Sequence, residues 1–235
     1  MRIVISQPMY FPWVGLLEQI RLADLFIHYD DVQYARGFFN RVQIKRENGV
    51  SWLTVPLRDL HQGQLINEVS IDERVDWRTR HRELLKHAYS ATPYIDEMLN
   101  IVDKVFSEKV NSLGDLSRAS VNCLSDYFGL MNGRRFICSS NLEIGGKGSE
   151  RLRDICVRFH ATTYITGHGA LNYLNHEIFE HCNIRVEYMN YKKIEYPQMH
   201  GAFTPFLTGL DLVANCGKEG VKFICSDAKY WKEFP

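Results

Sequence analysis

The first thirty-odd residues constrain the fold more than any other stretch of the chain. Residues 2–6, RIVIS, are a short β-rich run that is typical of a buried strand. Residues 15–24, GLLEQIRLAD, carry apolar side chains at helical spacing, and residues 25–34, LFIHYDDVQY, are a second β-rich run. A strand, a helix and a strand in this order predict a βαβ unit, which favours a parallel sheet with a right-handed crossover.

The middle of the chain interrupts this alternation. Residues 38–57 alternate, turn at an Asn-Gly pair and alternate again, which predicts a β-hairpin, and residues 65–72, LINEVSID, read as a further strand. From residue 76 to about 132 the pattern becomes helical. This helical stretch is either an insertion or cap on the sheet, or a subdomain of its own.

The last third returns to α/β alternation. Strands are predicted within residues 134–140, 161–167 and 184–193, and helices within residues 149–159 and 175–183, with Ser149 as the N-cap of the first helix. The whole chain, residues 1–235, therefore reads as one α/β domain. We expect a Rossmann-like, mostly parallel sheet with flanking helices, a β-hairpin excursion and the helical insertion or cap of residues 76–132.

Composition excludes several classes of protein. The chain is 45% hydrophobic and 24% charged, as globular domains are, and its 28 basic residues equal its 28 acidic ones, which disfavours a nucleic-acid partner. No apolar run approaches the roughly 18 residues of a membrane span, and the start lacks a signal-peptide pattern, so we expect a cytoplasmic protein without membrane insertion. The six cysteines contain no C-x-x-C pair and indicate neither zinc nor disulfides.

Four loops follow predicted strands and hold most of the unusual residues. They are QPMYFPWVG (7–15), HYDDVQY (28–34), CSSNLEIGGKGSE (138–150) and TGHGALNYL (166–174). Open parallel sheets bind ligands beyond the C-terminal ends of their strands. The coincidence of these loops predicts a single site at that edge of the sheet.

The first of these loops is rich in aromatic residues. Gln7 can donate and accept hydrogen bonds, while Tyr10, Phe11 and Trp13 can wall a pocket or stack on a planar ligand. Gly15 lets the following helix begin close to a ligand. The alternative is that the loop is a stiff aromatic plug at one end of the core.

The second loop supplies acids. On a strand, His28 and Asp30 share one face, whereas Asp31 and Gln33 share the other. Such acids can bind a metal, act as a base or hold sugar and amine groups. They can equally be ordinary solvated residues of a turn.

Several cations and an amide are candidate ligand contacts. Asn40 and Arg41 precede the hairpin, with Lys45 further along it, and an arginine suits a phosphate or a carboxylate. Lys147 lies in GGKGSE, a sequence that fails the Walker spacing but could form a flexible loop closing over a substrate. Surface solvation is the competing interpretation for each.

The last loop places a histidine between two glycines. His168 follows a predicted strand directly and could act as a base, and Gly167 and Tyr173 of the same loop are candidate ligand contacts. The other histidines show no metal-ligand spacing, so no metal is predicted.

The motifs together resemble a known family. QPMYFPWVG, DDVQY, NRVQI and WLTVP, followed by YITGHGALNYL and F-x-P-F-L-T-G-L-D-L-V-A-N-C-G, are similar to the WbqC-like protein family over nearly the whole chain. The resemblance implies a bacterial protein of surface-polysaccharide, particularly O-antigen (lipopolysaccharide), biosynthesis. Members of the family have been suggested to transfer glycine or a similar acyl unit to an amino sugar.

A second resemblance concerns the opening alone. The patterns P-x-x-x-P-W-x-G and A-D-x-F-I-x-x-D-D-V-Q look like the start of HIGH-motif nucleotidyltransferases and of pantothenate synthetase, which form adenylates. In this alignment Trp13 and Leu16 replace both histidines of the motif. The departure puts ATP chemistry of that kind in doubt.

These observations predict an aminoacyl- or acyltransferase. It would transfer a glycyl-like or acyl group to the amine of a nucleotide-linked amino sugar, with a small-molecule acyl donor. The alternatives are an ATP- and magnesium-dependent, adenylate-forming amide ligase or nucleotidyltransferase-like enzyme on the same substrates, and a non-catalytic sugar-nucleotide-binding or scaffold protein. The residue roles would be a base from His168, His28 or Asp30, oxyanion donors from Asn40, Gln7 or loop amides, and diphosphate contacts from Arg41, Lys45 or Lys147.

Overall fold

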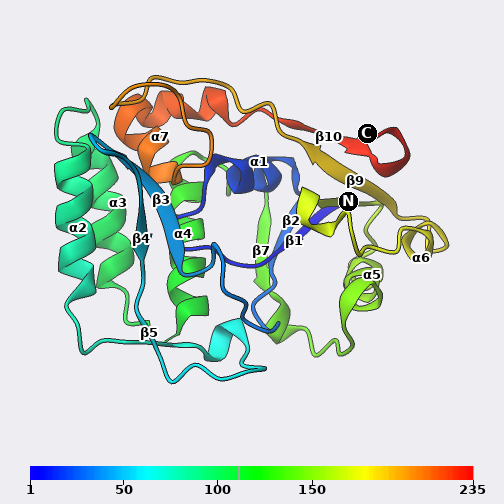
Figure 1. Ribbon diagram of the computed structural model, residues 1–235. Coiled ribbons are helices and arrows are strands. Elements are labelled where there is room, and N and C mark those ends of the chain that lie inside the picture. Colours follow the sequence, from blue (N-terminus) through cyan, green and yellow to red (C-terminus); the bar gives the residue numbers. More distant parts are fainter. Residues whose placement is uncertain (111, 235) are drawn as a thin grey trace.

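The computed structural model describes residues 1–110 and 112–234, and a six-stranded sheet runs through its centre (Figure 1). The strands of this sheet are β1 (Arg2–Ser6), β2 (Leu25–His28), β7 (Arg135–Cys138), β8 (Thr163–Thr166), β9 (Arg185–Asn190) and β10 (Asp227–Tyr230). Seven helices flank the sheet: α1 (Val14–Leu22), α2 (Trp77–Ala88), α3 (Ile95–Ser107), α4 (Leu113–Tyr127), α5 (Gly148–Arg158), α6 (Glu177–Glu180) and α7 (Gly209–Cys216).

The strand order confirms the Rossmann-like prediction. The sheet runs β10-β9-β8-β1-β2-β7, with parallel pairing everywhere except between β9 and β10. Numbered by their order along the chain, these six strands read 3-2-1-4-5-6 from β7 to β10, which is the doubly wound order. From β1 the chain adds β2 and β7 on one side of the sheet, and it then crosses back to add β8, β9 and β10 on the other side. The topological switch point therefore lies between β1 and β8.

The two faces of β1 build two cores. Ile3 and Ile5 point into a cluster with residues of α5 and α6, whereas Val4 points into a larger cluster with residues of α1, α4 and α7. All three side chains are buried, which is why this strand reads as a continuous apolar run rather than an alternating one. The helices of residues 76–132 share the larger cluster with the sheet, because α3 packs on both α4 and α7 and α2 packs on α3 (Figure 1).

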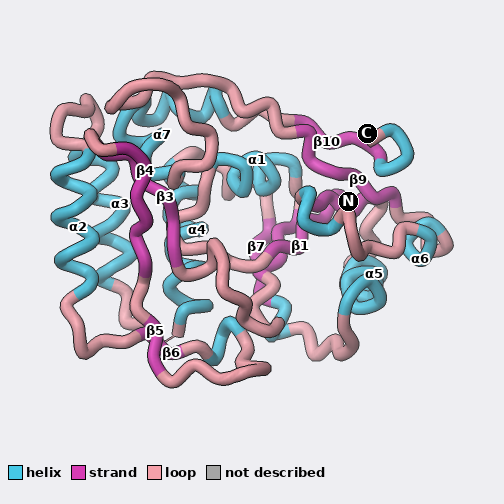
Figure 2. Tube along the Cα trace, in the orientation of Figure 1, coloured by secondary structure: helices cyan, strands magenta, loops and turns pink. Residues whose placement is uncertain are grey.

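The predicted hairpin forms a separate two-stranded sheet, visible as magenta strands beside the helices in Figure 2. Strands β3 (Arg41–Arg46) and β4 (Gly49–Thr54) pair antiparallel, and the shorter β5 (Leu57–Arg58) and β6 (Ser70–Ile71) form a second small sheet. Leu207 and Gln43 form an isolated bridge that ties the last third of the chain to β3.

Several local predictions need correction. The strand expected at residues 65–72 begins as a 3₁₀ turn at Ile66–Glu68 and contains only the two strand residues of β6. Ser149 is not an N-cap, because α5 begins at Gly148 after Lys147, and the Ser149 hydroxyl instead accepts from the Asn175 amide at 2.9 Å. The elements α7 and β10 lie in a stretch for which the sequence pattern predicts no element.

Among the described residues, no helix is both long and apolar enough to cross a bilayer. All six cysteines are free, and four of them are buried in the interior.

We expect the fold to weaken on acidification because of two buried histidines. Burial lowers the pKa of both His28 and His81 to about 4, so the unfolded chain binds their protons near pH 6.5 while the folded chain does not. Burial raises the pKa of Asp211 to about 6, so the folded chain binds this proton more tightly than the unfolded chain does. Acidification therefore stabilises the fold through Asp211 and offsets part of the loss from the histidines. Together these shifts predict a loss of about 3 kcal/mol of unfolding free energy between pH 7 and pH 4.5.

Urea unfolding at a series of pH values measures this loss. It should shrink by about 2 kcal/mol in a His28→Gln variant, because each buried histidine accounts for roughly that much. His87→Gln, on an exposed position of α2, is the matched control and should unfold with the wild-type pH dependence. Equal slopes in the His28 variant and the wild type would contradict this account.

Candidate functional site

A cavity of about 240 Å³ lies at the switch point, beyond the ends of β1 and β8. Its lining residues come from these two strands and the loops after them, from α1, from the end of β2 and from α5: Ile5, Ser6, Gln7, Gln19, Tyr29, Leu152, Tyr164, Thr166, Gly167, Gly169, Ala170 and Tyr173. Open doubly wound sheets bind their ligands at this place. The cavity is therefore the candidate functional site.

The cavity wall joins residues that lie far apart in the sequence. The Gln19 amide, on α1, donates to the Tyr191 hydroxyl at 2.7 Å. Burial raises the pKa of the Tyr191 phenol, so it stays protonated. Gly167 allows this contact, because a β-carbon at Gly167 would lie 3.2 Å from the Tyr191 oxygen and 3.3 Å from the Gln19 nitrogen.

The polar lining of the cavity is uncharged. Ser6, Gln7, Gln19 and Thr166 offer hydroxyl and amide groups that both donate and accept. Tyr29 and Tyr173 add aromatic rings, and burial raises the pKa of both phenols, which keeps them neutral donors. A lining of neutral donors and acceptors with aromatic faces suits a polyhydroxylated ligand such as a sugar.

A largely buried ion pair contacts Tyr29. An Arg151 Nη lies 2.5 Å from an Asp31 carboxylate oxygen, and the guanidinium carbon stands 5.1 Å from the centre of the Tyr29 ring. The Arg151 Nε also donates to the Ile144 carbonyl at 2.9 Å. Asp31 thus fixes an arginine that positions the cavity wall and does not itself line the cavity.

Asp30 anchors the loop after β7. Its side chain is buried, and its carboxylate accepts from the Ser139 hydroxyl at 3.2 Å, the Ser140 amide at 3.0 Å and the Ser140 hydroxyl at 2.9 Å. A carboxylate with these partners holds two loops together and does not reach the cavity. Asp30, predicted as a candidate base, is therefore not among the residues that line the cavity.

His28 is also interior. Its Nε2 lies 3.1 Å from the Asn122 Oδ1, and its Nδ1 is buried without a hydrogen-bond partner. Burial lowers the pKa of this imidazole to about 4. Because the ring packs against Phe26 and Phe136 and does not line the cavity, the structure does not place it for proton transfer there.

His168 lies at the rim of the cavity. Gly167 and Gly169 on either side of it line the cavity, and the imidazole itself is exposed. Its Nε2 lies 2.6 Å from the Met189 carbonyl oxygen, which can only accept, so Nε2 carries the proton. The Nδ1 is then left with its lone pair, as a general base requires.

The aromatic loop divides between two roles. Tyr10 and Phe11 are fully buried, and the Tyr10 hydroxyl lies 2.9 Å from the His81 Nδ1, so these two side chains plug the core and stack on no ligand. Trp13 is half-buried, and its indole lies over Gly15, where a β-carbon would come within 2.2 Å of the ring. The indole therefore covers the first turn of α1, where Rossmann folds ordinarily hold phosphates.

The remaining predicted contacts lie away from the cavity. The Asn40 side chain accepts from the Tyr34 hydroxyl and donates to the Val55 carbonyl, both at 3.0 Å. The Arg41 guanidinium stacks on Trp52 at 4.4 Å. Gln33 is exposed beside its bridge partner Leu65.

The two predicted lysines have different surroundings. Lys45 is buried and donates to the Gln198 side chain at 3.2 Å and the Gly201 carbonyl at 3.1 Å, so its amine is used within the fold. Lys147 is exposed before α5, the helix whose Leu152 lines the cavity. Of the predicted residues, the cavity brings together Gln7, Gly167 and Tyr173, with His168 at its rim.

Sequence reasoning missed most of the lining, including the polar residues Ser6, Gln19, Tyr29 and Thr166. It also missed Arg151 and Tyr191, which contact Tyr29 and Gln19 of the lining. Gln19 carries the one usable signal, since it is a polar residue on the buried side of an apolar helix. Within residues 1–110 and 112–234, no group of three or more histidine, cysteine or acidic side chains could hold a metal ion.

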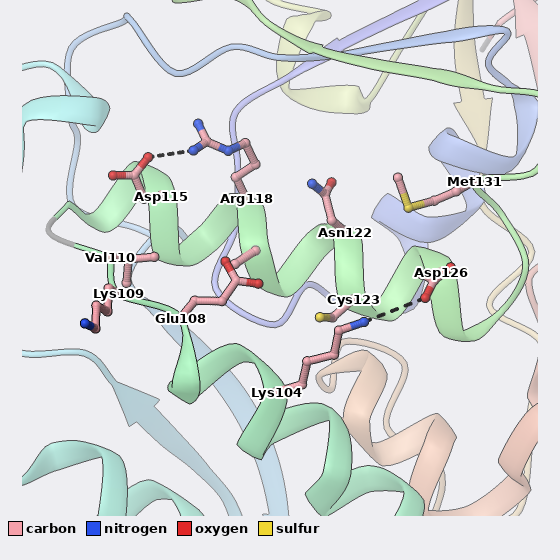
Figure 3. Close-up of a pocket in the computed structure, with 11 residues that line it drawn as sticks. Lys104, Glu108, Lys109, Val110, Asp115, Arg118, Asn122, Cys123, Asp126 and Met131 are labelled. Atoms are coloured by element: carbon pink, nitrogen blue, oxygen red, sulfur yellow. Dashed lines mark hydrogen bonds and ion pairs between the residues drawn. The ribbon is translucent and has the colours of Figure 1, made fainter.

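A second, larger cavity of about 480 Å³ lies along α3 and α4 (Figure 3). Its charged side chains are largely engaged with one another: Arg118 and Asp115 are 2.7 Å apart, and Lys104 and Asp126 are 3.9 Å apart. It lies on helices rather than at the strand ends, and exposed ion pairs of this kind favour a solvated groove.

Comparisons with known proteins agree with the motifs. The model of the WbqC-like protein family matches residues 7–223. A relative from Mycobacterium tuberculosis, named uncharacterized protein Rv1507c, is 33% identical over 227 residues, which cover 95% of this chain and 97% of the relative. No solved structure matches the chain.

We expect Asp30→Ala to destabilise the fold rather than act on chemistry alone. Removing the carboxylate leaves the backbone N–H and the hydroxyl of Ser140 without their acceptor, at a cost of about 2–3 kcal/mol, whereas the Ser139 hydroxyl keeps the Asp31 carboxylate at 2.5 Å. Urea unfolding measures the change. Asp154→Ala, an exposed acid on α5 paired with Arg153, is the control and should stay within about 0.5 kcal/mol of wild type. An unchanged midpoint for Asp30→Ala would contradict the anchoring role.

Proposed function

The chain belongs to the WbqC-like protein family, and from this membership and the cavity we propose that it is an acyl-transferring enzyme of polysaccharide biosynthesis. Family membership points to a role connected with polysaccharide biosynthesis. The finer proposal is that the enzyme transfers an aminoacyl (glycyl-like) or acyl group to the amine of a nucleotide-linked amino sugar.

The lining of the cavity is the observation that carries this proposal. Neutral hydroxyl, amide and phenol groups from β1, β8, α1 and the loops after the strands converge on one space at the switch point. Sugars are recognised by such groups together with aromatic faces. The volume of about 240 Å³ suits one sugar ring rather than a whole sugar nucleotide.

The chemistry follows from the residues around this space. The amine of the sugar attacks the carbonyl carbon of an activated acyl donor, and the Nδ1 of His168 accepts the proton that the nitrogen loses. The Gln7 amide group and the Gly169 backbone N–H, both at the cavity, are candidate donors to the oxyanion. Collapse of the tetrahedral intermediate forms the amide and expels the leaving group of the donor.

The covered first turn of α1 bears on the identity of the acyl donor. Adenylate-forming enzymes with a HIGH-type motif would hold ATP phosphates at this turn, but here the Trp13 indole lies on it. We therefore favour a donor that arrives already activated, such as an acyl thioester, over an adenylate made from ATP and magnesium in place.

A non-catalytic sugar-nucleotide-binding protein is the second candidate. One observation favours it: two of the three candidate bases, His28 and Asp30, are buried away from the cavity, which leaves His168 as the sole candidate of the three at the rim. Turnover separates the two candidates, because both predict binding.

Gly167→Ala tests the cavity as the sugar site. The new methyl group would lie 3.2 Å from the Tyr191 oxygen and 3.3 Å from the Gln19 nitrogen, so it should disturb this wall and weaken binding of UDP- or dTDP-linked amino sugars at least about tenfold by calorimetry. Gly145→Ala is the control, because Gly145 lies outside the cavity lining and its new methyl group would meet nothing within 4 Å, so this variant should bind as wild type does. If the two variants bind equally well, the sugar does not occupy this cavity.

His168→Ala tests the enzyme against the binding protein. With an amino-sugar nucleotide and an acyl thioester as substrates, turnover should fall by roughly 10²–10⁴-fold, because a general base is lost. Calorimetric affinity for the sugar nucleotide should change little, since His168 does not line the cavity. Full turnover in this variant would remove His168 as the base, and absence of turnover in the wild type would favour the binding protein.

A further inference from the structure

A row of three aromatic rings leads away from the rim of the cavity. Tyr191, which forms a hydrogen bond with Gln19 in the cavity wall, lies 5.0 Å from Trp13 between ring centres. Trp13 in turn lies 5.5 Å from Phe206. The three rings come from the end of β9, the loop before α1 and the segment before α7, so they meet only in the folded chain.

The far end of the row is open to solvent and carries a cation. Phe206 is 46% exposed, and the Lys193 amine stands 4.9 Å above its ring. The neighbouring Lys192 forms an ion pair with Asp227, but no carboxylate lies within ion-pair distance of Lys193 in the part of the chain that the structure describes. An exposed aromatic face beside an unpaired cation is available to a ligand.

The backbone at Lys193 adds a second observation. Its φ is 49°, in the left-handed region that non-glycine residues rarely adopt and that costs about 1 kcal/mol or more. Lys193 and Trp13 also border the same small hollow at the start of α1. The chain thus holds this lysine in an unfavourable conformation on the surface, next to the aromatic row.

We infer that Trp13, Phe206 and Lys193 form the subsite for the nucleoside diphosphate part of the substrate. This inference rests on the proposed function, because it assigns the second half of a sugar nucleotide whose sugar occupies the cavity. The base stacks on the faces of Phe206 and Trp13, as nucleobases do on aromatic side chains, and Lys193 neutralises the diphosphate. Tyr191 separates the two halves, touching Gln19 on one side and Trp13 on the other.

The covered helix start explains why the nucleotide would bind here. In a dinucleotide-binding Rossmann fold the phosphates lie against the first turn of the helix after strand one. Here the Trp13 indole lies over Gly15 at the start of this helix, and it also contacts Tyr191 and Phe206. The indole that closes the ordinary phosphate position belongs to the row that offers a stacking surface instead.

The test uses UDP and dTDP alone, without a sugar, titrated into the full-length protein by calorimetry. Phe206→Ala and Lys193→Gln should each weaken nucleotide binding about tenfold, since the first removes a stacking face and the second a charge, whereas Lys193→Arg should bind within about threefold of wild type. Phe38→Ala is the matched control, because Phe38 is a comparably exposed phenylalanine, at 54%, whose ring contacts Trp52 and not the row, and its removal should change nothing.

Tryptophan fluorescence gives a readout that misfolding would not mimic. Stacking of the base on Trp13 should quench its emission on addition of UDP, and Trp13→Phe should remove this quenching while binding by calorimetry persists. A quench that survives in Trp13→Phe would place the base elsewhere.

The outcomes for the two halves are separable. If wild type binds neither UDP nor dTDP, or if Phe206→Ala and Lys193→Gln bind them as wild type does, the subsite is overturned. If a sugar nucleotide still binds and Gly167→Ala weakens its binding, the proposed function stands even though the nucleotide subsite is overturned. Nucleotide binding that depends on Phe206 and Lys193, with no acyl transfer to any amino sugar, would support the subsite and count against the transferase.

Discussion

The central strand β1 is the element on which the rest of the structure depends. It is paired on both edges, with β2 on one side and β8 on the other, and its apolar side chains are buried on both faces. Because both edges and both faces of β1 are covered, only the ends of the strand are open to other groups. Because the chain winds first toward β7 and then returns past β1 toward β10, the loops after β1 and β8 diverge, and the space between them becomes the cavity.

The two halves of the loop after β1 have different roles. Its first half turns inward, where Tyr10 packs against Trp77 and Phe11 against Phe106, and so it fastens the helices of residues 76–132 to the sheet. Its second half returns to the surface with Trp13. A loop fixed by two buried aromatic residues has little freedom to move, so the cavity wall at Gln7 and the row at Trp13 are preorganised by the same core contacts.

The sequence predicts the sheet and the place of the site better than it predicts the individual site residues. The apolar run of residues 2–6 and the helical spacing after it are local signals, and they are enough to place loop ends together at one edge. The burial of Tyr10 depends on Trp77, far along the chain, and the contact between Gln19 and Tyr191 spans 172 positions. Nothing local distinguishes a tyrosine that plugs the core from one that stacks on a ligand. Asp30 is a similar case, because its serine partners follow β7 rather than β2.

Buried charge stabilises the irregular segment that completes the site. Residues 191–208 connect β9 to α7 without a helix or strand, yet they carry Tyr191, Lys193 and Phe206. Lys45 reaches this segment from β3 and donates to Gln198 and to the Gly201 carbonyl, and Tyr196 donates to the buried Asp211 at 2.9 Å.

Burying an amine and a carboxylate costs free energy that apolar packing would not, and the raised pKa of Asp211 records that cost. Their hydrogen bonds are directional, however, and they fix the position of the backbone and side-chain groups of the segment more precisely than apolar contacts would. We therefore infer that Lys45 and Asp211 are positioning residues, which hold the aromatic row beside the cavity. This role accounts for two charged side chains that are buried in the protein although neither of them lines the cavity.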